Sequence, residues 1–182
     1  MPSSSESYIS DIVSLVKKYR PESVLDIGVG FGKWGLLFRE YLDIWTNHNV
    51  LKSDWIIQID GVEIFEDYIQ AHQRFIYNNI YIGNITALID GLQNYDLIFM
   101  GDVLEHIEQA QARELLAKLK RKSRTLIIAI PLGDNWKQDE CFNNPYEEHI
   151  SQWTEQDFSD NAWHRIYGSN PIGVFLFKNE TK

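Results

Sequence analysis

The stretch Val24-Leu-Asp-Ile-Gly-Val-Gly-Phe-Gly-Lys-Trp-Gly35 decides the fold, because an apolar run opens directly onto a cluster of glycines. Ser23 to Ile27 predicts a short buried strand, and Lys33 to Leu42 predicts a helix. Two glycine patterns overlap in the turn between them, Gly28-x-Gly30-x-Gly32 and Gly30-x-Gly32-x-x-Gly35. A strand, a glycine-rich turn and a helix in this order are typical of a nucleotide-binding loop.

The position of the strand end distinguishes the two glycine patterns. In the dinucleotide-binding fingerprint the first glycine lies where the strand ends, and the third follows five residues later. If the strand ends at Gly28, that later position is Lys33, which breaks the fingerprint. A start at Gly30 would instead extend the strand through Gly28, which weakens a sheet, and place Asp26 in its interior, where a buried carboxylate needs a partner. We therefore favour the first pattern, in which Asp26 faces a ligand ammonium or orders the loop.

The remainder of the chain repeats this alternation of strands and helices. Further helices are expected at Ser7 to Tyr19, Glu66 to Ile76, Glu108 to Lys122 and Thr154 to Asp160, and further strands at Trp55 to Val62, Ile80 to Ile82, Asp96 to Met100 and Arg124 to Ile130. Apolar strands separated by helices predict one α/β domain over residues 1–182, with a parallel sheet covered on both faces. The last two strands, Trp163 to Tyr167 and Gly173 to Phe177, are joined by a turn too short for a parallel crossover. The final strand is therefore expected to be antiparallel.

Composition restricts the class of protein. A length of 182 residues suits one domain with a sizeable core. The net charge of −9 disfavours a nucleic-acid partner, because phosphate neutralisation requires clustered Lys and Arg. The single cysteine, Cys141, suits a reducing compartment, and the longest apolar run, Leu126 to Leu132, is too short to span a bilayer. We expect a soluble cytoplasmic protein with a small-molecule partner and no membrane association; the oligomeric state stays open.

Three motifs carry a family resemblance: Asp26-x-Gly28-x-Gly30-x-Gly32, Asp60-Gly-Val-Glu63-Ile64 and Tyr95-Asp-Leu-Ile-Phe-Met-Gly-Asp-Val-Leu-Glu-His-Ile107. Together they resemble the class I S-adenosylmethionine-dependent methyltransferases over about Pro21 to Lys178. The resemblance implies a Rossmann-like, mostly parallel seven-stranded sheet with an antiparallel last strand and helices on both faces. It also implies S-adenosyl-L-methionine as cofactor and S-adenosyl-L-homocysteine (SAH) as product. The cofactor-binding half would cover about 21–107, and the acceptor-side half about 108–182.

The resemblance also implies which residues bind the cofactor. Glu63 matches the acidic residue that accepts both ribose hydroxyls, and Ile64 would pack on the adenine face. Asn84 stands where family members often carry an Asp for the adenine amino group, and its amide oxygen can also accept a hydrogen bond. Asp102 follows the fourth strand, at the carboxyl edge where ligands bind in such sheets. The predicted set is Asp26, Gly28, Gly30, Gly32, Glu63, Ile64, Asn84, Asp102 and Val103.

Methyl transfer is an in-line displacement that needs alignment and, for hydroxyl or amine acceptors, often a base. The base candidates are His106 and His149, each of which also has a purely structural interpretation. We expect a small-molecule or glycan-like acceptor, methylated on oxygen or nitrogen. Two alternatives stay open: a partner subunit that binds the cofactor without catalysis, and an NAD-dependent oxidoreductase, which is less favoured.

No metal site is assigned from the sequence. Asp102 with Asp134 and Asn135 is similar to the oxygen ligands of the catechol-type magnesium-dependent O-methyltransferases. However, Pro131-Leu-Gly-Asp-Asn135 is equally an ordinary turn. No two histidines are spaced for zinc. The long connection from Asp43 to Trp55 has no assigned role.

Overall fold

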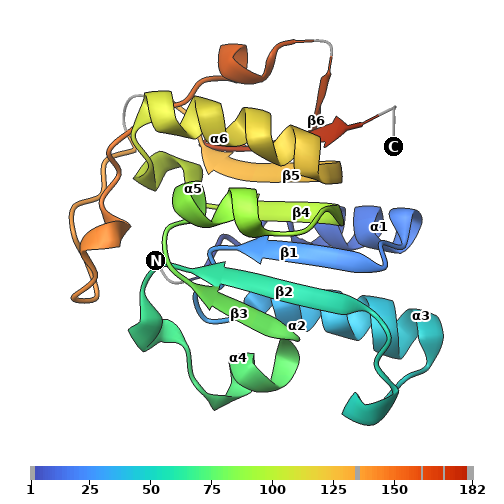
Figure 1. Cartoon of the computed structure of the whole chain (residues 1–182). Coiled ribbons are helices and arrows are strands. Elements are labelled where there is room, and N and C mark those ends of the chain that lie inside the picture. The colour runs from blue at the N-terminus through green and yellow to red at the C-terminus, as the bar shows by residue number, and fades with distance from the viewer. Residues whose placement is uncertain (1–2, 134–135, 161, 170, 180–182) are drawn as a thin grey trace.

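Seven strands form one sheet, in the order β3-β2-β1-β4-β5-β7-β6. The structure is a computed structural model that describes residues 3–133, 136–160, 162–169 and 171–179. The strands are β1 Ser23–Ile27, β2 Gln58–Glu63, β3 Asn79–Ile82, β4 Tyr95–Gly101, β5 Ser123–Pro131, β6 Trp163–Ser169 and β7 Ile172–Lys178 (Figure 1). Strands β1 to β5 pair in parallel, whereas β7 pairs antiparallel with both β5 and β6. The predicted mostly parallel sheet with an antiparallel last strand is confirmed.

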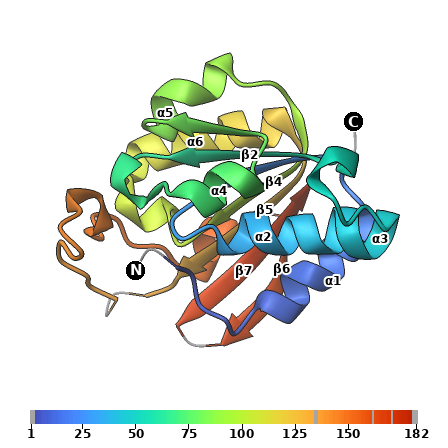
Figure 2. The same cartoon turned by 90° about the horizontal axis from the view of Figure 1, so that it is seen from below.

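Helices cover both faces of this sheet. They are α1 Ile9–Tyr19, α2 Lys33–Arg39, α3 Trp45–Asn47, α4 Ala71–Ile76, α5 Ile85–Leu88 and α6 Gln109–Lys122. Helices α1, α2 and α4 pack on one face, and α5 and α6 pack on the other (Figure 2). No helix among the described residues is long and apolar enough to cross a membrane.

Aromatic side chains fill the core on each face. On the α1–α2 face the rings of Trp34 and Phe99 lie 4.5 Å apart, and Tyr8 stacks on Trp34 at 5.5 Å. On the opposite face Phe158 stacks on Phe175 with ring centroids 4.2 Å apart. Because both faces are covered, the central strands are buried along almost their whole length, which explains their continuous apolar runs.

Several predicted elements have different boundaries in the structure, and three of the differences have a local cause. The strand expected from Trp55 begins at Gln58, because a 3-10 turn over Lys52–Asp54 precedes it. The helix expected over Glu66 to Ile76 is broken, since Gln70 is extended and starts α4 with a Gln70–Gln73 capping box. The helix expected at Thr154 to Asp160 is a 3-10 turn over Glu155–Phe158. In the two helical cases a capping box starts a shorter element in place of the expected helix.

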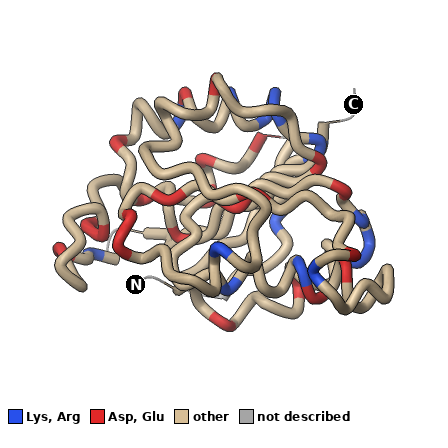
Figure 3. The backbone as a smooth tube through the Cα atoms, turned by 60° about the horizontal axis from the view of Figure 1, so that its bottom comes forward, with Lys and Arg blue, Asp and Glu red and all other residues tan. Residues whose placement is uncertain are grey.

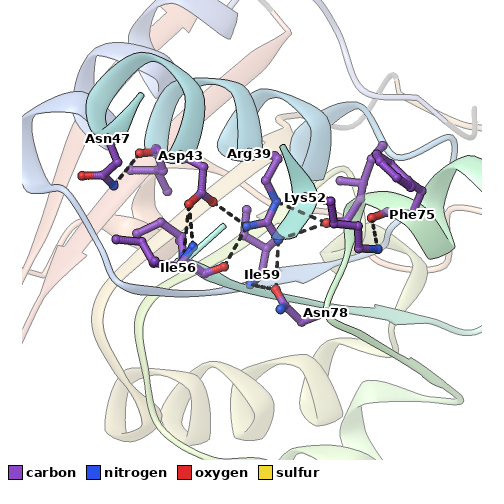
Figure 4. Close-up of polar contacts among 11 residues, drawn as sticks. Arg39, Asp43, Asn47, Lys52, Ile56, Ile59, Phe75 and Asn78 are labelled. Carbon is purple, nitrogen blue, oxygen red and sulfur yellow. Dashed lines mark hydrogen bonds and ion pairs between the residues drawn. The ribbon is translucent and has the colours of Figure 1, made fainter. Parts of the chain in front are cut away.

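A buried arginine connects α2 to neighbouring elements on the face of the sheet that α1, α2 and α4 cover. Helix α2 continues into a π-helical turn over Glu40–Ile44, and Arg39 at the junction is 2% exposed. Its Nη1 donates to Asp43 Oδ2 at 2.5 Å and to Ile57 O at 2.8 Å. Its Nη2 donates to Ile76 O at 3.0 Å and to Asn78 Oδ1 at 2.9 Å (Figure 4). One guanidinium thus connects α2, the residue before β2 and the end of α4.

The connection from Asp43 to Trp55 packs back onto this arginine. The Arg39 guanidinium lies 4.4 Å from the Trp55 ring centroid, and Trp55 meets Phe75 edge-on at 5.5 Å. Asp43 Oδ1 accepts a hydrogen bond from Ile56 N at 2.8 Å. This connection therefore packs against the end of α2 through Arg39.

The two edge strands differ from the inner ones. Strand β3 has four residues, none of them fully buried. Strand β6 pairs antiparallel with β7, and the register of this pairing shifts between Arg165 and Tyr167, as in a β-bulge.

Candidate functional site

A cavity of ≈ 260 Å³ lies at the carboxyl ends of the parallel strands. Strand β1 has β2 on one side and β4 on the other, so the connections that follow β1 and β4 diverge here. In open α/β sheets, ligands bind at this kind of switch point. Of the predicted cofactor residues, those that line the cavity are Gly28, Gly30, Glu63, Ile64, Asn84, Asp102 and Val103.

The glycine turn after β1 has a backbone that other residues rarely adopt. Gly28, Gly30 and Gly32 have φ angles of 84°, 49° and 88°. Gly28 N donates to Val62 O at 2.9 Å, and a Cβ at Gly28 would overlap the Cγ2 methyl of Val103. The turn therefore needs glycine both for its left-handed conformation and for close packing. Gly32 lies at the N-cap of α2, outside the cavity lining.

Glu63 holds this turn against the end of β2. The side chain is 5% exposed; Oε2 accepts from Gly30 N at 2.8 Å and Oε1 from Phe65 N at 2.9 Å. Burial raises the pKa of this carboxyl group above its usual value. The carboxylate is at the same time part of the cavity wall.

Asp26 is a buried residue of β1 and is not among the residues that line the cavity. Its Oδ2 accepts a hydrogen bond of 2.5 Å from the Tyr77 hydroxyl, which in turn accepts from Gly35 N at 3.1 Å. Complete burial raises the Asp26 pKa to about 7. Of the two roles left open by the sequence, these contacts favour ordering of the loop and of α2. Gly35 packs directly against the Tyr77 ring, which leaves no room for a side chain there.

Asn84 lines the cavity, but its side chain is already engaged. Its Oδ1 accepts from both Thr86 N and Thr86 Oγ1 at 2.9 Å and so caps α5. An adenine amino group would compete with this cap for the same oxygen, which the sequence pattern did not indicate.

Asp102 has a strained backbone at the end of β4. Its φ is +52°, which is uncommon for a residue other than glycine and occurs at functional sites. Its Oδ2 accepts from the Tyr8 hydroxyl at 3.2 Å, and burial raises the pKa of the carboxyl group. Ser3 and Ser4 also line the cavity, and Lys33 Nζ donates to Ser4 O. The segment before α1 is thus a wall of the cavity, and no motif in the sequence indicated this.

The two histidines proposed as bases lie side by side, although they come from distant segments. Their ring centroids are 4.8 Å apart at an interplanar angle of 70°. His106 follows β4 and lines the cavity, whereas His149 is not among the lining residues and has its Nε2 3.9 Å from Glu105 Oε1. Burial lowers the pKa of His106. A neutral His106 is therefore available to accept a proton.

The segment after β5 is docked onto the turn that follows β4. Ile150 N and Ser151 N each donate to Glu105 O at 3.0 Å, and Ser151 Oγ donates to Leu104 O at 3.2 Å. Tyr68 donates to Glu147 Oε1 at 2.9 Å. The cavity residues contributed by this segment are Asn144, Tyr146, Glu147 and Ile150, none of which the motifs indicated. Asp134 and Asn135, the oxygen ligands considered above, lie outside the described residues.

The cavity is more acidic than basic. Its charged lining consists of Glu63, Asp102, Glu108 and Glu147 against Lys33. Across the described backbone, acidic and basic residues are interspersed (Figure 3). A cationic or neutral ligand suits such a lining better than a polyanion.

No family model matches the sequence, and no curated protein matches it either. Solved structures match in fold. The N-terminal domain of EvdMO1 in the presence of SAH and D-fucose has a TM-score of 0.65 and 13% identity, over 98% of this chain and 85% of that one. The methyltransferase domain of a bacterial CtHen1 has a TM-score of 0.59 and 18% identity, over 93% and 96%. TehB from Haemophilus influenzae has a TM-score of 0.64 and 14% identity, over 97% and 64%.

Proposed function

Because the chain has the fold of the class I S-adenosylmethionine-dependent methyltransferases, we propose that it binds S-adenosyl-L-methionine. We further propose that it transfers the methyl group to an oxygen or nitrogen of a small, sugar-like acceptor and releases SAH. The observation that carries this proposal is the convergence of the Gly28–Gly30 turn, Glu63 and Asp102 on one cavity at the switch point of the sheet.

The residues present fit the cofactor. The glycine turn allows close approach of a ligand to the backbone, which suits the methionine part. Each oxygen of Glu63 accepts one backbone hydrogen bond and keeps further acceptor capacity for ribose hydroxyls. Ile64 and Val103 supply apolar contacts for the adenine ring, and the Asp102 carboxylate suits a positively charged ligand. When bound, the sulfonium supplies an activated methyl group, so the protein mainly has to align the acceptor.

The wall formed by residues 144–150 supports a sugar-like acceptor. Tyr146 and Ile150 line the cavity while 48% and 54% exposed, so they present apolar surface to an incoming molecule. Aromatic and apolar faces beside carboxylates suit a neutral ring that carries hydroxyl groups. The EvdMO1 structure was determined in the presence of D-fucose, which is such a ring. The acidic lining argues against a nucleic-acid acceptor.

Calorimetric titration tests the proposal most directly. SAH is expected to bind with micromolar affinity, and NADH is expected not to bind. Binding of NADH without SAH would instead support the oxidoreductase alternative. A screen of sugars and other metabolites for SAH production then separates an active enzyme from a partner subunit that only binds the cofactor.

Replacement of Glu63 tests the cofactor contact. Glu63→Ala should weaken SAH binding by about 1.5–3 kcal/mol, because hydrogen bonds to a charged group are lost. Glu66→Ala is the matched control, since Glu66 is exposed and lies outside the cavity lining. An affinity equal to that of the wild type would remove Glu63 from the site.

Replacement of Tyr146 tests the acceptor wall. Tyr146→Ala should raise the acceptor KM by about three- to tenfold, the scale of one aromatic contact, and leave SAH affinity unchanged. Phe142→Ala is the control, because Phe142 is exposed but does not line the cavity. Equal acceptor KM values in both variants would argue against acceptor binding at this wall.

A further inference from the structure

Three potential metal ligands meet beside the cavity. Glu105 and His106 belong to the 3-10 turn after β4, and His149 comes from the segment docked onto that turn. One ligand atom of each residue lies within 4.8 Å of the other two. Donors around a single ion at about 2.0–2.2 Å lie roughly 3–4 Å apart, so small side-chain rotations suffice to close the set.

Hydrogen bonds fix the tautomer of both histidines. His106 Nδ1 lies 2.9 Å from Glu148 O, and His149 Nδ1 lies 3.0 Å from Trp136 O. A carbonyl oxygen only accepts, so each Nδ1 must carry the proton that it donates. Each Nε2 is then left as a lone-pair donor. This arrangement, with one ring nitrogen held by a carbonyl and the other free, is the usual one for metal-binding histidines.

Glu105 independently indicates a cation at this position. The side chain is 2% exposed, and within the described part of the chain its Oε2 has no hydrogen-bond partner. Its Oε1 lies 3.9 Å from His149 Nε2. A carboxylate buried without a partner is costly, and Asp102 and Glu147 nearby add negative charge. A cation between Glu105 and the two Nε2 atoms would compensate the charge and use the free oxygen.

We infer that Glu105, His106 and His149 bind one divalent transition-metal ion at the side of the cavity. Two imidazoles and one carboxylate favour a first-row transition metal over magnesium, which prefers oxygen ligands. Three protein ligands leave coordination positions open for another molecule. This inference replaces the sequence-based expectation of no metal, and His106 and His149 become ligands instead of bases.

The role of the ion in catalysis, unlike the binding itself, rests on the proposed function. An acceptor hydroxyl that bound to the ion would lose its proton to solvent more easily, because the metal would lower its pKa. The oxygen then forms a bond to the methyl carbon as the carbon–sulfur bond breaks. The electron pair of that bond stays on sulfur, which leaves neutral SAH.

Direct cobalt titration tests the site without cofactor or acceptor. The full chain is freed of metal with a chelator and titrated with Co²⁺, followed by visible absorption and calorimetry. One Co²⁺ is expected to bind per chain, with displacement by Zn²⁺ and little competition from Mg²⁺. Glu105→Gln and His149→Ala should each weaken binding by at least about 100-fold, since each removes a direct ligand. His164→Ala, an exposed histidine on β6, should bind Co²⁺ as the wild type does.

The controls keep this inference separate from the proposed function. Circular dichroism and thermal melting establish that each variant is folded, and Glu105→Gln keeps the side-chain volume where His149→Ala does not. Absence of saturable Co²⁺ binding, or equal affinity in wild type, Glu105→Gln and His149→Ala, would overturn the metal site. Neither result bears on SAH binding, which is measured separately. Loss of SAH binding with intact Co²⁺ binding would contradict the proposed function alone.

Discussion

Gly28→Ala is expected to weaken SAH binding by at least about 30-fold. At φ 84° a residue with a Cβ carries a cost of about 1–2 kcal/mol. The added methyl group would also overlap Val103 Cγ2, and overpacking of this kind costs about 1–3 kcal/mol. Cofactor binding requires the loop in this conformation, so we expect the cost to appear as weaker binding. Calorimetric titration of the folded variant with SAH measures the effect.

Gly91→Ala is the matched control for this substitution. A Cβ at Gly91 has no neighbour within 4 Å, and Gly91 does not line the cavity. SAH affinity should therefore equal that of the wild type. Tight binding by Gly28→Ala would show that the cofactor does not contact this turn.

Arg39→Met is expected to lower the free energy of unfolding by about 3–5 kcal/mol. The substitution leaves Asp43, which is fully buried, as an uncompensated charge, and breaking a buried ion pair in this way costs that amount. It also leaves Ile57 O and Asn78 Oδ1 without the donor that Arg39 provides (Figure 4). Urea denaturation followed by circular dichroism measures the change.

An exposed ion pair provides the control for Arg39. Arg113 Nη2 lies 2.5 Å from Asp157 Oδ1, the same length as the Arg39 pair, but the Arg113 side chain is 54% exposed. Arg113→Met should therefore cost no more than about 1 kcal/mol. Addition of Asp43→Asn to Arg39→Met should restore part of the lost stability, because no unpaired charge then remains. A loss for Arg39→Met as small as that for Arg113→Met would contradict the structural role of the buried pair.

Much of the fold could be predicted because its signals are local. The run from Ser23 to Ile27 and the glycines after it predict a strand, a turn and a helix without information from elsewhere in the chain. The short turn between the last two strands likewise requires antiparallel pairing. The break at Gln70 in the helix expected from Glu66 was missed because a side-chain capping box at that residue overrides helical periodicity.

The candidate site depends more on contacts between distant segments, which a single sequence does not show. His106 and His149 meet where Ile150 and Ser151 dock on the Glu105 carbonyl. In the same way, Tyr77 lies far along the chain from Asp26, and no motif pairs them. Glu63 was predicted because the motif Asp60-Gly-Val-Glu63-Ile64 resembles that of a known family, and it is the last residue of β2, at the sheet edge where the cavity lies. Residues placed by strand ends are therefore easier to predict than residues placed by loop docking.

The edge strands β3 and β6 affect how this protein behaves at high concentration. An edge strand is a template for a strand from another molecule when it is long and flat, with a row of free N–H and C=O groups. Strand β3 has only four residues, and the bulge between Arg165 and Tyr167 interrupts β6. Neither edge of the sheet thus offers the regular row of hydrogen-bonding groups that edge-to-edge aggregation requires. We therefore expect that the sheet does not extend into a neighbouring molecule.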